Sequence, residues 1–259
     1  MRDTTYRNRL RRAREHALLC LFPRRCAFCG GVTVPRALLC GDCEGKAEAV
    51  FCAPRCLRCG RVLADCVCAQ KERALPVLSV FSYHSAARGF LLRMKFHGEP
   101  GWAPSLGYAM ADRLCTLRLA GDAAELRAWL FCAVPMTKRQ ERARGFNQSR
   151  LLAGYAAAWL GAAFMPGMLT KRCETKVQHG LPAEEREQNV AGAYAVPEAA
   201  LVRGRKIVLC DDVTTTGATL RACAAQLLAA GAAEVVCLTF LETKLEASGV
   251  SHGAYTIPQ

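Results

Sequence analysis

Two adjacent carboxylates and a loop of small hydroxyl residues lie between residues 207 and 220, which read IVLCDDVTTTGATL. Asp211 and Asp212 follow a continuous apolar run, which predicts a strand buried on both faces. Ligands of open α/β sheets bind beyond the carboxyl ends of the strands. A Thr-rich loop that opens a helix offers backbone N–H groups and hydroxyls to a phosphate, and glycine lets the backbone approach it closely. The predicted phosphate-binding residues are Thr214, Thr215, Thr216, Gly217, Ala218 and Thr219.

Each part of this segment has a simpler explanation on its own. Two acids at a strand end are typical of a solvated turn, and neighbouring threonines are typical of a helix N-cap. The order of apolar strand, acid pair, Thr/Gly loop and helix favours a phosphate site over both. Asp211 and Asp212 are the candidate catalytic residues, because their carboxylates can accept hydrogen bonds from sugar hydroxyls or act through Mg2+ and its waters.

Ten of the sixteen cysteines lie between residues 20 and 68, mostly in closely spaced pairs. A Cys-x-x-Cys unit folds into a tight turn whose two thiolates point the same way, and two such units complete a tetrahedron around Zn2+. The ligands of the first predicted structural site are Cys26, Cys29, Cys40 and Cys43. A second site, for which Cys52 is a competing ligand, would comprise Cys56, Cys59, Cys66 and Cys68.

Cationic and amide side chains follow an apolar run at residues 129–134 and recur before residue 190. Cations placed after a strand can bind pyrophosphate or a nucleic-acid backbone. Residues 177–187 are polar and contain a proline, as expected of a mobile loop over a site. Exposed basic groups are common, so we expect roughly half of the arginines in residues 138–150 to touch ligand. The candidates for pyrophosphate or DNA binding are Lys138, Arg139, Arg142, Arg144, Asn147, Gln148, Arg172, Gln178 and Arg186.

Beyond residue 70, strand-like and helix-like runs alternate. Strand, crossover helix and strand in sequence predict an α/β fold with a mostly parallel sheet. The predicted strands are residues 77–83, 129–134, 167–172, 206–210 and 234–241, and the predicted helices are 90–96, 105–119, 148–160 and 218–230. We expect four segments: a basic N-terminal segment (1–25), a double zinc ribbon (26–70), the α/β domain (77–241) and a tail (242–259).

Other side chains are predicted to serve packing alone. Tyr155 and Trp159 lie four residues apart in a helix-like run, so they share one helix face. Isolated cysteines in apolar surroundings behave as small buried hydrophobic residues. These cysteines are Cys115, Cys132, Cys173, Cys210, Cys223 and Cys237.

The chain has 35 Lys and Arg against 22 Asp and Glu, and its net charge of +13 favours an anionic partner. A solvated basic surface is the alternative, above all for the Arg-rich residues 1–25. A hydrophobic content of 52% excludes a disordered chain. No apolar run is long enough to span a bilayer, and residues 17–23 lack a signal-peptide cleavage pattern, so we expect a cytoplasmic protein.

The segment from Ile207 resembles the phosphoribosyl pyrophosphate (PRPP) motif of type I phosphoribosyltransferases. The resemblance implies that fold over residues 77–241, with PRPP and Mg2+ as the expected ligand. It also implies that the acid pair faces the ribose and that the Thr/Gly loop holds its 5-phosphate.

Together with the double cysteine head and the segment RGFNQ at residues 144–148, the chain is similar to the ComF/GntX family from residue 26 to residue 241. The spacing Cys66-x-Cys68 departs from the family pattern, which puts the second zinc site in doubt. The resemblance implies a cytosolic role in handling single-stranded DNA, during natural transformation or in the use of DNA as a nutrient. A DNA-uptake helicase or a recombination protein is a further implied partner.

Two main functions stay open. The first is a DNA-handling accessory protein that binds a phosphoribosyl ligand or a nucleotide end, which the basic clusters and cysteine pairs favour. The second is a working phosphoribosyltransferase, in which a nitrogen base displaces pyrophosphate from PRPP. A regulator that kept the fold only to sense a ligand is a third. The sequence shows no identifiable base-recognition pocket, so turnover is undecided.

Overall fold

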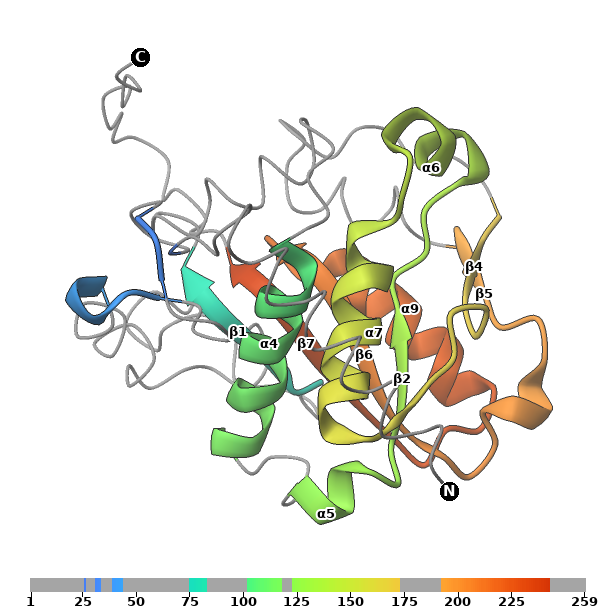
Figure 1. The fold of residues 1–259 in the computed structure, drawn as a ribbon. Helices are drawn as coiled ribbons and strands as arrows, with labels where there is room; N and C mark the ends of the chain where they lie inside the picture. The colour runs from blue at the N-terminus through green and yellow to red at the C-terminus, as the bar shows by residue number, and fades with distance from the viewer. Residues whose placement is uncertain are drawn as a thin grey trace, which may run out of the picture.

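Two nine-residue strands, β6 (Lys206–Thr214) and β7 (Glu234–Glu242), lie side by side within a parallel sheet (Figure 1). The computed structural model describes residues 26, 31–33, 39–43, 75–82, 102–117, 123–172 and 192–242. Within them, β6 and β7 are joined by β1 (Val77–Ser82), β2 (Leu130–Ala133) and β3 (Ala163–Phe164). The sheet order is β1-β7-β6-β2-β3 and every pairing is parallel, which confirms the predicted fold class.

Helices cover both faces of the sheet. Helices α4 (Ala103–Leu117) and α7 (Gln148–Leu160) pack on one face, and α9 (Ala218–Ala229) packs on the other (Figure 1). Along β6, Val208 and Cys210 belong to the α7 side of the core, and Ile207 and Leu209 belong to the α9 side. Alternate side chains of a strand point to opposite faces, so β6 is buried on both. The shorter helices are α5 (Ala123–Leu126), α6 (Lys138–Arg144) and the 3-10 turn η3 (Ala199–Leu201).

Local caps fix where the helices near the site begin and end. Thr137 starts α6 with a reciprocal capping box: its hydroxyl accepts from the Gln140 backbone N–H, and the Gln140 side chain accepts from the Thr137 N–H. Asn147 caps α7, which ends at Gly161 with a left-handed φ of 69°. The predicted helix at residues 148–160 is therefore confirmed at both ends.

Two predicted strands differ from the structure, and one predicted helix falls on residues that the structure does not describe. The predicted strand at 167–172 is only β4 (Thr170–Lys171), which pairs with β5 (Tyr194–Ala195) in a separate antiparallel hairpin. β6 does not stop at residue 210 but runs through the acid pair to Thr214, because β7 pairs with it along that whole length. The predicted helix at 90–96 lies outside the described residues.

The described cysteines near the N-terminus belong to the main core. Cys26, Leu39 and Cys43 are buried in the same apolar cluster as α4, α7 and one face of the sheet. In Figure 1 the short segments at residues 31–33 and 39–43 lie beside β1. No helix among the described residues combines the length and apolarity needed to cross a bilayer.

Candidate functional site

A cavity of about 360 Å³ lies at the carboxyl end of β6, where it brings the acid pair and the predicted phosphate loop together. The loop after β2, helix α6 and the β4–β5 hairpin supply the rest of its wall. This is the position at which open parallel sheets bind their ligands. Its polar and charged lining residues are Gln140, Arg144, Lys171, Tyr194, Asp211, Asp212, Thr214, Thr215 and Thr219.

Asp211 and Asp212 are both buried and both line the cavity. Asp211 Oδ1 accepts two hydrogen bonds, from Ser149 Oγ at 2.7 Å and from the Asp212 backbone N–H at 2.9 Å. Ser149 lies in the first turn of α7, so that helix holds the Asp211 carboxylate in one orientation. No local sequence pattern indicates this contact, because the two residues lie 62 positions apart.

The threonines of the phosphate loop have two structural roles: three line the cavity and one forms hydrogen bonds within the turn. Thr214, Thr215 and Thr219 line the cavity. Thr216 Oγ1 instead accepts from the Ala218 N–H at 3.3 Å, and the Thr216 carbonyl accepts from Arg221 Nη1 at 2.7 Å. Thr216 therefore shapes the turn before α9, whose N-cap is Gly217, while its neighbours line the cavity.

Gly217 connects this turn to α9 in a left-handed conformation, with φ of 78°. A side chain is strained in that region, and a Cβ added there would lie 3.1 Å from Arg221 Nη1. The turn directs the N-terminus of α9 at the cavity, where the partial positive charge of the helix dipole favours an anion.

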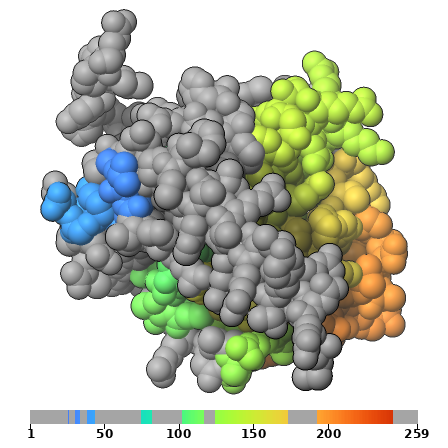
Figure 2. All heavy atoms as spheres, viewed as in Figure 1, coloured from blue at the N-terminus to red at the C-terminus, as the bar shows by residue number. Residues whose placement is uncertain are grey.

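Of the four predicted cations on α6, Arg144 lines the cavity together with Gln140. Lys138, Arg139 and Arg142 are exposed and lie outside its lining. The helix buries none of its residues and protrudes at the upper right of the molecule (Figure 2). The α6 cations thus form a basic knob next to the cavity, and Arg144, which is also exposed, is the one that lines its wall.

Asn147 and Gln148 occupy buried positions at the start of α7. Asn147 Nδ2 donates to the Val134 carbonyl at 3.1 Å, which ties α7 to the end of β2, and Asn147 Oδ1 accepts from the Arg150 N–H. Gln148 Oε1 accepts from Arg144 Nη1 at 3.5 Å. Both side chains therefore make contacts that position α7 and Arg144.

The β4–β5 hairpin contributes Lys171 and Tyr194, neither of which sequence reasoning had singled out. The Lys171 ammonium lies 5.7 Å from the centroid of the Tyr194 ring, within cation–π range. The neighbouring Arg172, a predicted ligand contact, is exposed and lies outside the cavity lining. Gln178 and Arg186 lie outside the described residues.

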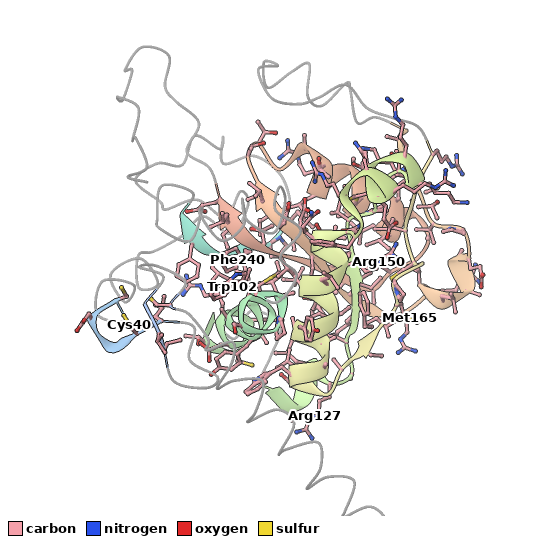
Figure 3. All side chains as sticks on the ribbon, turned by 45° about the horizontal axis from the view of Figure 1, so that its top comes forward. Cys40, Trp102, Arg127, Arg150, Met165 and Phe240 are labelled. Carbon is pink, nitrogen blue, oxygen red and sulfur yellow. The ribbon has the colours of Figure 1, made fainter. Side chains whose placement is uncertain are left out.

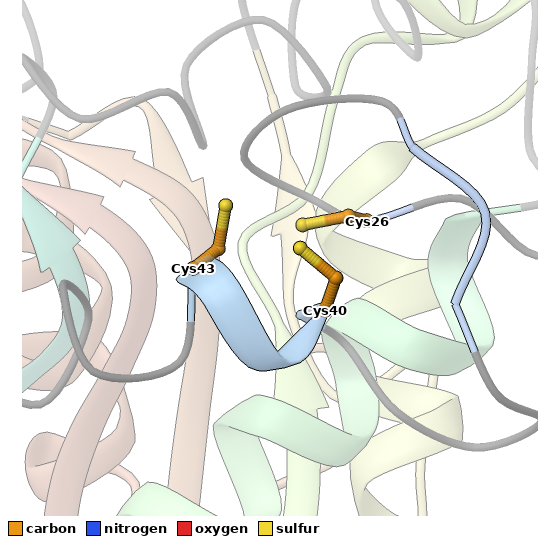
Figure 4. Close-up of side chains that lie close together, drawn as sticks. All are labelled: Cys26, Cys40 and Cys43. Atoms are coloured by element: carbon orange, nitrogen blue, oxygen red, sulfur yellow. The ribbon is translucent and has the colours of Figure 1, made fainter.

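Three of the predicted zinc ligands converge. The Sγ atoms of Cys26, Cys40 and Cys43 all lie within 4.8 Å of one another, and Figure 4 shows them directed toward a common point. Sulfur atoms on a tetrahedral zinc site with Zn–S bonds of about 2.3 Å lie about 3.8 Å apart, so this set fits a structural zinc ion. Cys29 and the second set, Cys56, Cys59, Cys66 and Cys68, lie outside the described residues.

Comparisons with known proteins agree with this geometry. A family model described as "Phosphoribosyl transferase domain" matches residues 173–258, which include the phosphate loop. The chain is 32% identical over 212 residues to DNA utilization protein YhgH of Salmonella typhimurium, covering 81% of this chain and 86% of that protein. The protein of the same name from Escherichia coli K12 is 30% identical with the same coverage.

Competence protein F of Haemophilus influenzae is 26% identical over 230 residues, which cover 83% of this chain and 95% of that protein. In each of these three comparisons the match covers most of this chain and most of the relative. Together with the parallel sheet, the phosphate loop and the cysteine cluster, they show that the chain belongs to the ComF family and carries a phosphoribosyltransferase-type domain.

Proposed function

We propose that this protein binds a PRPP-type phosphoribosyl ligand with Mg2+ in the cavity, and single-stranded DNA on the basic surface beside it. The role that follows is in DNA uptake, natural transformation or the use of DNA as a nutrient. The observation that carries the proposal is one cavity joining the acid pair and the phosphate loop to Arg144 and Lys171 on its other walls.

The chemistry of the lining matches the two ends of such a ligand. The hydroxyls and backbone N–H groups of the loop suit a 5-phosphate, and the two carboxylates suit ribose hydroxyls. Arg144 and Lys171 are the cations that suit a pyrophosphate group. The carboxylate oxygens also fit Mg2+, which when bound would neutralise charge on the pyrophosphate.

DNA binding is supported by the charge and position of α6. Its three cations outside the cavity lining are exposed, and α6 itself reaches the cavity through Arg144. A strand held there by its phosphates would lie close to the cavity mouth. The names of the relatives, which refer to DNA utilisation and competence, point the same way.

The first experiment is a calorimetric titration of the full chain with Mg2+-PRPP. We expect Asp212→Asn to weaken binding at least tenfold, because a hydrogen bond to a charged group contributes about 1.5–3 kcal/mol. Asp112→Asn is the matched control, since Asp112 is an exposed acid on α4 outside the cavity lining. Equal affinity of both variants, or no PRPP binding by the wild type, would refute the ligand assignment.

The second experiment measures binding of a single-stranded oligonucleotide across a salt series. Replacing Lys138, Arg139 and Arg142 with alanine should lower the slope of log affinity against log salt by about 2, because each phosphate contact contributes about 0.7. Arg203→Ala with Arg205→Ala is the control. Both arginines are exposed and directly precede the first residue of β6, so they lie at the end of the strand away from the cavity. An unchanged slope would remove α6 from the DNA surface.

A catalytically active phosphoribosyltransferase is the second candidate, favoured by the two cations placed across the cavity from the acid pair. Arg144 and Lys171 would stabilise departing pyrophosphate electrostatically while a nitrogen base attacks the anomeric carbon. Release of pyrophosphate from Mg2+-PRPP with one of the common bases would establish turnover. PRPP binding without release for any base would leave the binding function alone.

A further inference from the structure

Two large aromatic side chains lie on the solvent side of α7. Tyr155 is 44% exposed and Trp159 is 54% exposed, although the sequence predicted both to be packing residues. They are four residues apart and therefore lie on one face of the helix. Exposed tryptophan is uncommon at this extent, because burial of its ring is strongly favourable.

Both aromatic residues of α7 pack against α4. The Trp159 and Tyr108 ring centroids lie 4.3 Å apart with an interplanar angle of 66°, an edge-to-face contact. At Gly107 the two helices approach so closely that an added Cβ would lie 2.5 Å from Tyr155 Cβ. Tyr108, Tyr155 and Trp159 together form what we call the aromatic platform.

An arginine lies near each end of α7, and the one at its start is paired with an acid. At its start, Arg150 is bound to Glu141 of α6 at 2.9 Å, which joins α7 to the basic knob. At its end, Arg127 Nε lies 3.9 Å from the position of a Cβ added to Gly161. Figure 3 shows Arg150 and Arg127 near opposite ends of the helix. α7 itself carries no acidic residue, and the nearest acid on α4 is Asp112, one turn beyond Tyr108.

The start of α7 also lies next to the cavity, because it contacts the lining residue Asp211. Ser149 donates to Asp211, and Trp159 lies ten residues further along the same helix, about 15 Å at 1.5 Å per residue. A single strand that leaves the cavity mouth past α6 can therefore reach the platform within a few nucleotides. The bases of such a strand are unpaired, so their faces are available for stacking.

We propose that the aromatic platform stacks the bases of single-stranded DNA whose phosphates are held by α6. This rests on the proposed DNA-binding function and assigns a second surface to it. Exposed rings on a helix with cations near its two ends match the way in which proteins bind single strands, by stacking on bases and by attraction of the backbone. Charge favours this occupant over an apolar protein surface, because Arg127 lies near the end of α7 and the exposed cations of α6 lie near its start.

The test compares affinity for a fluorescent oligonucleotide between the full wild-type chain and Tyr155→Ala with Trp159→Ala. Stacking contributes about 1–3 kcal/mol per base, so we expect affinity to fall at least tenfold with little change in salt slope. PRPP affinity should stay as in the wild type, because neither ring lines the cavity. Leu228→Ala is the matched control, since Leu228 is 48% exposed on α9, on the opposite face of the sheet.

Trp159→Phe gives a second readout that does not depend on the double variant folding. It keeps a ring for stacking and should retain affinity within a few-fold. Stacking should quench tryptophan fluorescence in the wild type, and that quenching should be much smaller in Trp159→Phe. Quenching that is the same in both proteins would overturn the proposal.

The outcomes separate this inference from the proposed function. No DNA binding by the wild type refutes the proposed function itself. DNA binding that depends on the α6 cations but is the same in Tyr155→Ala with Trp159→Ala as in Leu228→Ala refutes the aromatic platform alone. A wild-type dimer that the double variant converts to a monomer, with DNA affinity unchanged, would show that this face binds a second copy and would also overturn the proposal.

Discussion

Lys171 and Arg172 show how a single position decides which cation reaches the cavity. Both are basic and both follow Thr170, but Lys171 lines the cavity and Arg172 is exposed. Lys171 is paired with Tyr194 in the β4–β5 hairpin, and consecutive side chains of a strand point to opposite sides. The pairing of Lys171 with Tyr194 of β5, more than the charge of either basic residue, therefore decides that Lys171 and not Arg172 lines the cavity.

We predict that Lys171→Met weakens binding of Mg2+-PRPP tenfold or more, because it removes a charged hydrogen-bond donor worth about 1.5–3 kcal/mol. Arg172→Met should change the affinity much less, since its guanidinium lies outside the cavity lining. Calorimetric titration of the two variants measures the difference. The reverse order would mean that the hairpin takes another register when ligand is bound.

At the scale of elements, α7 connects the site to the core. Its cap residue Asn147 bonds the end of β2, Ser149 holds Asp211, and its middle packs closely on α4. A displacement of α7 therefore moves the carboxylate that it orients. Gly107 is the position on which the α4–α7 contact depends, because a Cβ there would also lie 3.0 Å from the Ala156 nitrogen and the Leu152 oxygen.

Gly107→Ala should lower the free energy of unfolding by about 1–3 kcal/mol, the usual cost of overpacking a close contact. Gly154→Ala is its matched control within α7, since an added Cβ there would make only ordinary contact with Phe164 at 3.4 Å. Alanine favours helix by about 1 kcal/mol over glycine, so this second variant should be neutral or slightly stabilised. Urea unfolding of both measures the effect, and equal destabilisation would contradict the close crossing.

At the scale of the whole molecule, the cysteine cluster and the sheet share one core. Cys26 and Cys43 are buried in the same cluster as Phe81 of β1 and Met110 of α4. A metal ion at the cluster would therefore stabilise the apolar packing around it as well as its own loops. The division into a separate zinc ribbon and an α/β domain stays a prediction, and the shared core argues that the two unfold together.

Removal of zinc by a chelator should lower the thermal midpoint of the whole protein by several degrees in a single transition. Cys40→Ser should show the same lowered midpoint without chelator, and one zinc ion fewer per chain by elemental analysis. Calorimetry measures the transition. Two separate transitions, with the sheet domain unaffected, would show that the shared core does not couple them.

Buried thiols give the molecule a characteristic response to high pH. Burial raises the pKa of Cys132, Cys210, Cys223 and Cys237, and for the last three the Asp211 charge adds to the effect. These thiols stay neutral in the folded state, whereas those of the unfolded chain ionise above about pH 8.5. The contribution of these thiols to the free energy of unfolding is therefore fully present below that pH and decreases as the pH rises above it.

Each such thiol should lower the free energy of unfolding by about 1.4 kcal/mol per pH unit above pH 8.5. Cys132→Ala should reduce that slope by about this amount, whatever it costs at neutral pH. Urea unfolding between pH 8 and pH 10 under reducing conditions measures it. An identical slope in the variant would mean that Cys132 ionises in the folded protein.

The sequence alone determined the features that depend on neighbours along the chain. The strand, acid pair, Thr/Gly loop and helix in order predicted the elements of the site, and the helix-like run at residues 148–160 predicted α7 to the residue. The spacing of the cysteines predicted that Cys26, Cys40 and Cys43 converge. Short-range periodicity and knuckle geometry are sufficient for each of these, because they involve residues that lie close together in the sequence.

Only the tertiary structure decided which side chains of those elements act together. It selected Arg144 and Lys171 for the cavity, bound Ser149 to Asp211, and gave Thr216 to the turn. It also left Trp159 exposed on a helix face that its spacing had suggested was packed. These outcomes depend on strand register and on the approach of α4 to α7, which are contacts between distant residues that no local pattern encodes.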